Sequence, residues 1–191
     1  HAGLLVRSVL DCTTGVLVEG PCVVVDRVLW LNGAASIADF AAGRGAAELP
    51  ATGTEGLLLR KAEVEGEKQV WSGTRVGLVL RDEKSDESSG PSTHSSGKPS
   101  EFCTRPYRFS TAPERLSKFR SGFAVVAYLA GKAAVPSRFG IPQQHYDKYI
   151  AAAERARKSG DPAPWVNRKI GTQPELCELI GACHNVLKAL P

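Results

Sequence analysis

The chain of 191 residues is long enough for one medium domain with appendages or for two small domains. Hydrophobic residues make up 42% of it and charged residues 23%, which is ordinary for a globular protein with its own core. The most apolar run, 16–31, is interrupted by Glu19, Asp26 and Arg27, and a spanning helix needs about 20 uninterrupted apolar residues. The composition therefore predicts a soluble or peripheral protein without a transmembrane segment.

The net charge of +4 is distributed unevenly along the chain. Residues 1–80 hold seven Lys/Arg and nine Asp/Glu, whereas residues 101–191 hold fourteen Lys/Arg and seven Asp/Glu. The second half is therefore basic, which suits RNA, an acidic lipid surface or an acidic protein partner. The chain begins at His1 and contains no Met, and we expect a processed chain or part of a longer one, with removal of a transit peptide as one explanation.

In the first half, short β-branched runs predict strands. Gly20-Pro21 separates the first two of them, and Asn32-Gly33 ends the second with a strong turn signal. Ser36 is a suitable cap for a short helix over 36–47, with Asp39 at its third position. The predicted strands are 15–19, 22–30, 56–60, 69–71 and 76–80. We expect Trp30 to lie in the core, in which case its replacement by Ala costs on the order of 3–5 kcal/mol.

The composition changes abruptly over 81–101, where Ser, Gly, Pro and charged residues dominate. Such a segment cannot anchor a core, so we predict a disordered insertion or linker. Deleting 85–100 should cost little stability, because the entropy of loop closure depends only weakly on loop length.

Helical signals are stronger in the second half. Pro113 in a first turn predicts a helix over 112–120 that ends at Gly122, and the run 123–128 reads as a strand. A further helix is predicted over 147–159, with Gly160 as its stop, and an amphipathic helix over 174–190.

Together these elements predict an α/β or α+β fold, in which a small mixed β-sheet is flanked by helices and followed by a helical C-terminal extension. The predicted division is 1–80 for the strand-rich first part of the domain, 81–101 for the insertion, 102–142 for the second part, and 143–191 for the basic helical extension.

The cysteines do not form a recognisable framework. Their odd number favours a reducing compartment over a set of disulfides. Cys177, Cys183 and the adjacent His184 come closest to a metal site, but the spacing of six separates the thiols on a helix and a fourth ligand is lacking. Buried free thiols are the favoured interpretation, and no metal site is predicted. The five are Cys12, Cys22, Cys103, Cys177 and Cys183.

No catalytic or cofactor-binding residues are predicted either. His1 is terminal, His94 lies in the polar insertion, and His145 and His184 have no carboxylate or nucleophile near them in the sequence. The glycines of 43–45 lack the Lys-Ser/Thr ending of a phosphate loop and the spacing of a dinucleotide fingerprint.

Residues 105–109 interleave basic and aromatic side chains, as a site that stacks single-stranded nucleic acid does. The alternative, which we favour from the sequence, is that solvated basic residues surround ordinary core aromatics. The last helix either docks on a partner by its apolar stripe or folds back on its own domain. The candidate basic patch consists of Arg105, Arg108, Arg115, Lys118 and Arg120, with Tyr107 and Phe109.

Part of the chain resembles a small α/β domain found in a mitochondrial complex I assembly factor and its bacterial relatives. That family has a strand, a Gly-Pro step, a second apolar strand and a Trp-Asn pair, which are similar to 14–30 with Trp30-Leu-Asn32. Its Leu-Glu-Pro step and buried strand are similar to 48–50 and 55–59, and its later helix-to-strand junction to 116–126. The resemblance covers 8–140. The family's Gly-Thr-Gly and its terminal alanine-rich strand have no clear counterpart, and neither does the tail from Gln143.

The resemblance implies a non-catalytic mitochondrial protein on the matrix side. It implies protein–protein contacts as an accessory subunit or assembly factor of the respiratory NADH dehydrogenase, complex I, and it carries over no site residue. The alternative is an RNA-contacting structural component of a mitochondrial ribosome, served by the basic second half. A small enzyme is the third hypothesis.

Overall fold

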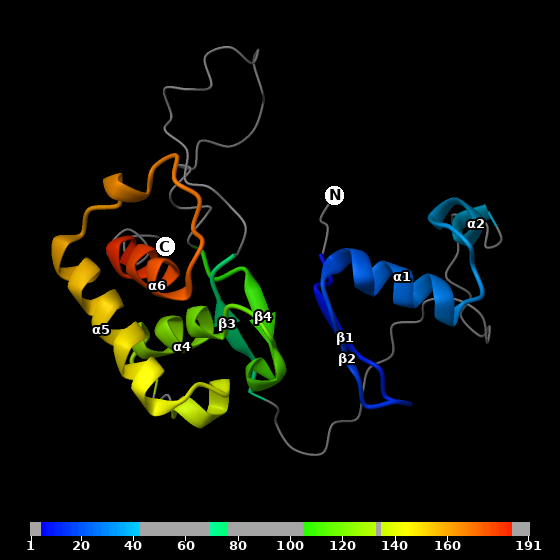
Figure 1. The fold of residues 1–191 in the computed structure, drawn as a ribbon, viewed down its shortest axis with the longest axis horizontal. Coiled ribbons are helices and arrows are strands. Elements are labelled where there is room, and N and C mark those ends of the chain that lie inside the picture. Colours follow the sequence, from blue (N-terminus) through cyan, green and yellow to red (C-terminus); the bar gives the residue numbers. More distant parts are fainter. Residues whose placement is uncertain (1–4, 43–68, 76–104, 133–134, 185–191) are drawn as a thin grey trace, which may run out of the picture. The chain divides into compact units, whose positions relative to one another are not determined.

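The computed structural model describes residues 5–42, 69–75, 105–132 and 135–184 (Figure 1). The chain divides into two units, His1–Glu67 and Lys68–Pro191, and each is described by itself. The predicted strands 56–60 and 76–80, the insertion 81–101, and the predicted helical residues 43–47 and 185–190 lie outside the described residues. The predicted division into four parts stays a prediction.

The first unit opens with a hairpin of β1 (Ser8–Leu10) and β2 (Leu17–Glu19). The strands are antiparallel, with Ser8 opposite Glu19 and Leu10 opposite Leu17. Gly15, at φ +70°, supplies the left-handed residue that the connecting loop needs. The strand predicted over 15–19 is thus confirmed, beginning two residues later than expected.

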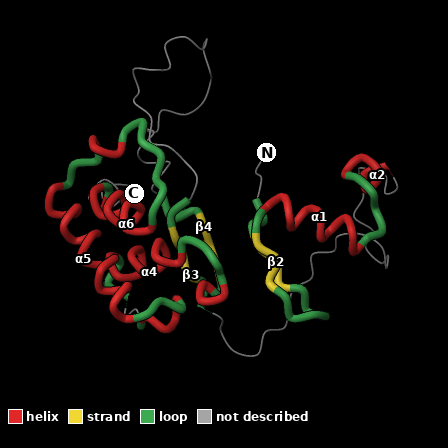
Figure 2. The backbone as a smooth tube through the Cα atoms, in the orientation of Figure 1, coloured by secondary structure: helices red, strands yellow, loops and turns green. Residues whose placement is uncertain are grey.

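The second predicted strand is wrong, because residues 22–30 belong to a helix, α1 (Pro21–Leu31) (Figure 2). Pro21 occupies the first helical turn, where its missing N–H is not needed and its fixed φ suits the helix. Gly33, at φ +64°, follows the C-cap Asn32, so the turn predicted there ends a helix rather than a strand. Val24 is the buried residue of α1, which packs on β1 and β2. Trp30 is 67% exposed, and its predicted place in the core is wrong as well.

The short helix α2 (Ile37–Ala42) follows. The Ser36 hydroxyl accepts a hydrogen bond from the Asp39 backbone N–H at 3.0 Å, and the Asp39 carboxylate accepts one from the Ala35 N–H at 2.8 Å. The first bond satisfies an amide that the first turn of a helix leaves without a partner, and the second ties the residue before the cap to the helix. The predicted cap is confirmed.

The second unit contains a two-stranded antiparallel sheet and a group of three helices. In the sheet, β3 (Trp71–Gly73) pairs with β4 (Arg108–Ser110), and Ser72 lies opposite Phe109. One face of this sheet is packed: the Trp71 ring meets the ring of Phe139 edge to face at 4.9 Å between centroids. Phe139 belongs to the 3₁₀ turn η3 (Pro136–Phe139). The strand predicted over 69–71 is displaced to 71–73.

Residues 120–129 form a helix, α4 (Arg120–Leu129), so the strand predicted over 123–128 is wrong. The helix predicted over 112–120 is also wrong: only the 3₁₀ turn η2 (Pro113–Arg115) forms there, and Leu116 is extended at ψ 140°. Gly122, predicted as a stop, lies inside α4. All residues from 121 to 125 are buried. The sequence of α4 therefore lacks the periodic alternation of apolar and polar residues by which an amphipathic helix is recognised.

Two further helices complete the second unit. The helix predicted over 147–159 is confirmed as α5 (Gln143–Ser159), which begins a turn earlier and ends at Gly160 with φ +61°. The last predicted helix is confirmed within the described residues as α6 (Gln173–Ala182). A reciprocal pair of hydrogen bonds between Thr172 and Glu175 caps α6. A turn, η4 (Ala163–Trp165), joins α5 to α6.

The core of the second unit lies where α4, α5 and α6 meet (Figure 1). Its C-terminal helices therefore belong to the same packed group as α4. The described residues form a mixed α and β protein with five α-helices and two separate antiparallel strand pairs, which confirms the predicted class. None of the helices in the described ranges has both the length and the apolar character to cross a membrane. The central core cluster consists of Val125, Ala152, Ala153, Leu176, Cys177 and Ile180.

Candidate interaction surfaces

The two cysteines of α6 lie in different parts of the core. Cys177 packs with α4 and α5, whereas Cys183 packs in a second cluster with Trp165 and Leu179. Both are buried free thiols, as predicted. Burial raises the pKa of the Cys177 thiol to about 12, so this group is a protonated core residue at neutral pH.

The other residues considered for chemistry are scattered. His145 is exposed on α5 beside Tyr149, and His184 is buried after α6. His1, His94, Cys103 and the glycines of 43–45 lie outside the described residues. Within the described ranges, no three His, Cys, Asp or Glu side chains come together as metal ligands would.

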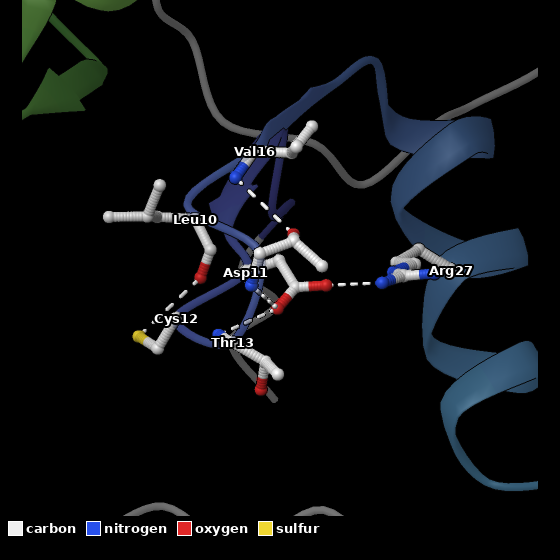
Figure 3. Close-up of polar contacts among 7 residues, drawn as sticks. Leu10, Asp11, Cys12, Thr13, Val16 and Arg27 are labelled. Carbon is white, nitrogen blue, oxygen red and sulfur yellow. Dashed lines mark hydrogen bonds and ion pairs between the residues drawn. The ribbon is translucent and has the colours of Figure 1, made fainter.

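In the first unit, an ion pair joins the hairpin loop to α1 (Figure 3). The Arg27 guanidinium donates a hydrogen bond to one carboxylate oxygen of Asp11. The other carboxylate oxygen accepts bonds from the backbone N–H groups of Thr13, at 2.9 Å, and Thr14, at 3.2 Å. The Arg27 hydrogen bond, followed by the backbone bond from Thr14, lowers the pKa of Asp11 from 3.8 to about 2. The carboxylate therefore orders the loop and fixes the position of Arg27.

Arg27 also lies over the indole ring of Trp30, with its guanidinium carbon 4.2 Å from the ring centroid. Val23, Arg27 and Trp30 follow one another at intervals of four and three residues, so they share one face of α1. Leu31 extends this face, and Val23, Trp30 and Leu31 are all exposed. We call these four residues the Trp30 face.

In the second unit, aromatic side chains project from β4 and the residue before it. Tyr107 is 49% exposed and Phe109 is 65% exposed, while Arg108 between them is partly buried. Arg108 lies over the buried ring of Phe123, with its guanidinium carbon 4.9 Å from the centroid. The sequence therefore identified the basic-aromatic residues of 105–109, but its favoured interpretation, that the aromatics are core residues, is wrong for these two.

The sequence did not predict the Trp30 face because 22–30 was assigned to a strand. In a strand, Val23, Arg27 and Trp30 would be too widely spaced to form one cluster. A usable signal was present. Pro21 after Gly20 marks a helix start, and Asn32-Gly33 marks a helix end as well as it marks a hairpin turn.

Comparison of the chain with protein-family models, with curated proteins and with solved structures finds no match.

Proposed function

We propose that this protein is non-catalytic and acts through protein–protein contacts made by the Trp30 face. The observation that supports this proposal is an exposed tryptophan held in place by an arginine. Trp and Arg are the residues that most often dominate the binding energy of protein interfaces. A tryptophan left 67% exposed contributes little to its own core, so its apolar surface is available to a partner.

The contacts of Arg27 add to this argument. Its guanidinium bonds to Asp11 on one side and lies over Trp30 at 4.2 Å on the other. The indole is therefore restrained before any partner arrives, which reduces the side-chain entropy lost on binding. A partner that fits this face has an apolar pocket deep enough for an indole ring, with an acceptor group near the remaining donors of Arg27.

For the partner, we propose subunits of the respiratory NADH dehydrogenase, complex I, on the matrix side of mitochondria, with this protein as an accessory subunit or assembly factor. The support for this assignment is the resemblance of 8–140 to the assembly-factor family. The same resemblance implies a second strand at 22–30, where the chain has α1. The experiment below therefore tests the identity of the partner separately from the role of the Trp30 face.

The experiment is native separation of gently solubilised mitochondria that contain the tagged full chain. We expect the chain to migrate with subunits of NADH dehydrogenase and the Trp30→Ala variant to lose that association. Phe109→Ala is the matched control, because it removes an equally exposed aromatic from the second unit. Migration with ribosomal particles would refute the complex I assignment. Unchanged migration of Trp30→Ala would refute the role of the Trp30 face.

A further inference from the structure

The sheet of β3 and β4 has one packed face and one open face. On the packed face, Trp71 meets Phe139, and Gly73 lies so close to Phe123 that a Cβ at position 73 would be 2.9 Å from its ring. The open face carries Phe109, with Ser72 opposite it in register. Tyr107, the residue before β4, is exposed as well, while Arg108 between the two aromatics is partly buried. Two neighbouring aromatic rings are thus presented to solvent by a strand whose other face is fixed in the core.

Cationic groups lie beside these rings. The Arg105 guanidinium donates a hydrogen bond to the Tyr107 hydroxyl at 2.8 Å, and its carbon lies over the same ring, 5.9 Å from the centroid. Arg108 donates to the carbonyl oxygens of Lys118 and Phe119, each at 3.4 Å, so it ties the loop that carries Lys118 to β4. Lys118 is itself exposed, as is Arg115. These Arg108 bonds hold the backbone of the Lys118 loop to β4 from the side on which Arg108 packs over Phe123.

The charge balance of this region is one-sided. Glu114 is the one acidic residue in 105–132, against six basic residues. Such a surface attracts a polyanion. A folded acidic protein or a lipid headgroup would match the positive charge but offers no row of planar rings to stack on exposed aromatics such as Phe109. The six basic residues are Arg105, Arg108, Arg115, Lys118, Arg120 and Lys132.

We propose that the open face of β3 and β4 binds single-stranded nucleic acid. Two successive bases stack on Tyr107 and Phe109, while Arg105, Arg115 and Lys118 contact the phosphates. A single strand is the polyanion that also offers free aromatic faces, whereas a duplex keeps its bases stacked on each other. This surface belongs to the second unit and is independent of the Trp30 face, so it is a second activity beyond the proposed protein contacts.

The test is fluorescence anisotropy of the full chain with a labelled, unstructured RNA of about 12 nucleotides, within the range of known single-strand site sizes. Replacing one stacking aromatic by Ala should weaken binding by about tenfold or more. We therefore expect that loss for Phe109→Ala and for Tyr107→Ala, and near-normal binding for Phe109→Tyr, which keeps a ring. Trp30→Ala should bind RNA as the parent chain does, which separates this proposal from the preceding one.

Further binding measurements identify which feature of the ligand is recognised. Lys118→Gln should reduce the dependence of log K on log salt concentration by about 0.7, as the loss of one single-strand phosphate contact does. A DNA strand of the same length distinguishes RNA from single-stranded nucleic acid in general, and Phe109-dependent binding of either supports the site. No binding at about 50 mM salt would overturn the proposal, as would equal binding of an abasic strand, a duplex or anionic vesicles.

Discussion

Gly181 of α6 packs directly on the backbone of Ala153 of α5. A Cβ at position 181 would lie 2.8 Å from the carbonyl carbon of Ala153 and closer still to its oxygen. The two helices meet at this point because residue 181 has no side chain. The absence of one methyl group therefore sets the closest approach of the two helices that form much of the core.

We expect Gly181→Ala to destabilise the second unit by about 3 kcal/mol or more. Alanine is intrinsically better in a helix by about 1 kcal/mol, but overpacking against backbone that cannot move aside costs more than that. Urea denaturation measures the change. Gly171→Ala is the control, because a Cβ there meets only the Glu175 carboxylate, at 3.8 Å, and its effect should stay within about 0.5 kcal/mol. Equal stabilities for the two variants would contradict the close packing.

The contact between Asp11 and Arg27 should depend on pH. The pKa of Asp11 is lowered to about 2 in the folded chain, from 3.8, so its ionised form is favoured by folding. The stabilisation is complete above about pH 4 and is lost as the pH falls toward 2. An NMR titration of the Asp11 carboxyl carbon checks this, and Arg27→Gln should move the midpoint back toward 3.8. Arg7→Gln is the control: Arg7 is the residue before β1, and its replacement should leave the Asp11 midpoint unchanged. A midpoint for Asp11 that does not respond to loss of Arg27 would show that the ion pair is not its cause.

The thiols should differ sharply in reactivity. Cys12 and Cys22 are exposed, whereas Cys177 is fully buried with a pKa of about 12. Because the thiolate is the reactive form, a thiol reagent at about pH 8 should modify Cys12 and Cys22 first and reach Cys177 only after the core opens. Peptide mapping by mass spectrometry follows each site. Labelling in concentrated urea, where the difference should vanish, is the control, and native labelling of Cys177 as fast as that of Cys12 would disprove its burial.

The tryptophans should contribute unequally to stability. Trp30→Ala should lower the free energy of unfolding by less than about 1 kcal/mol, since the ring is mostly exposed and loses mainly its stacking with Arg27. Trp71→Ala should cost about 3–5 kcal/mol, because its ring is buried against Phe139. Thermal or urea unfolding followed by circular dichroism compares the two variants. A larger loss of unfolding free energy for Trp30→Ala than for Trp71→Ala would contradict the exposed position of Trp30 and the buried position of Trp71.

The errors in reading the sequence fall on particular residues. Val23, Val24 and Val25 favour a strand by propensity, yet they form the first turns of α1 because Pro21 starts a helix and Arg27 then reaches Asp11. The run from Phe123 to Tyr128 is apolar on most sides because α4 lies between α6 and the β3–β4 sheet. A buried helix and a buried strand leave the same continuous apolar pattern in a sequence.

For the candidate surfaces, the sequence shows which residues are present but not which of them are exposed. The basic and aromatic residues of 105–109 are visible in the sequence, and so is Trp30. Which of them are exposed is not visible, because exposure depends on what packs against each face. Arg108 turns inward over Phe123, and Phe109 consequently turns outward.

By itself, the sequence determined features that depend on a few neighbouring residues: the cap at Ser36, the end of α5 at Gly160, the two C-terminal helices and the basic second half. Local hydrogen bonds, glycine conformation and side-chain polarity fix these without long-range contacts. Only the tertiary structure decided that 123–128 is a helix, that Trp30 is exposed, and that Tyr107 and Phe109 are exposed beside the partly buried Arg108. Those outcomes depend on contacts between residues far apart in the chain, such as Asp11 with Arg27 and Arg108 with Phe123, and packing of that kind overrides local propensity.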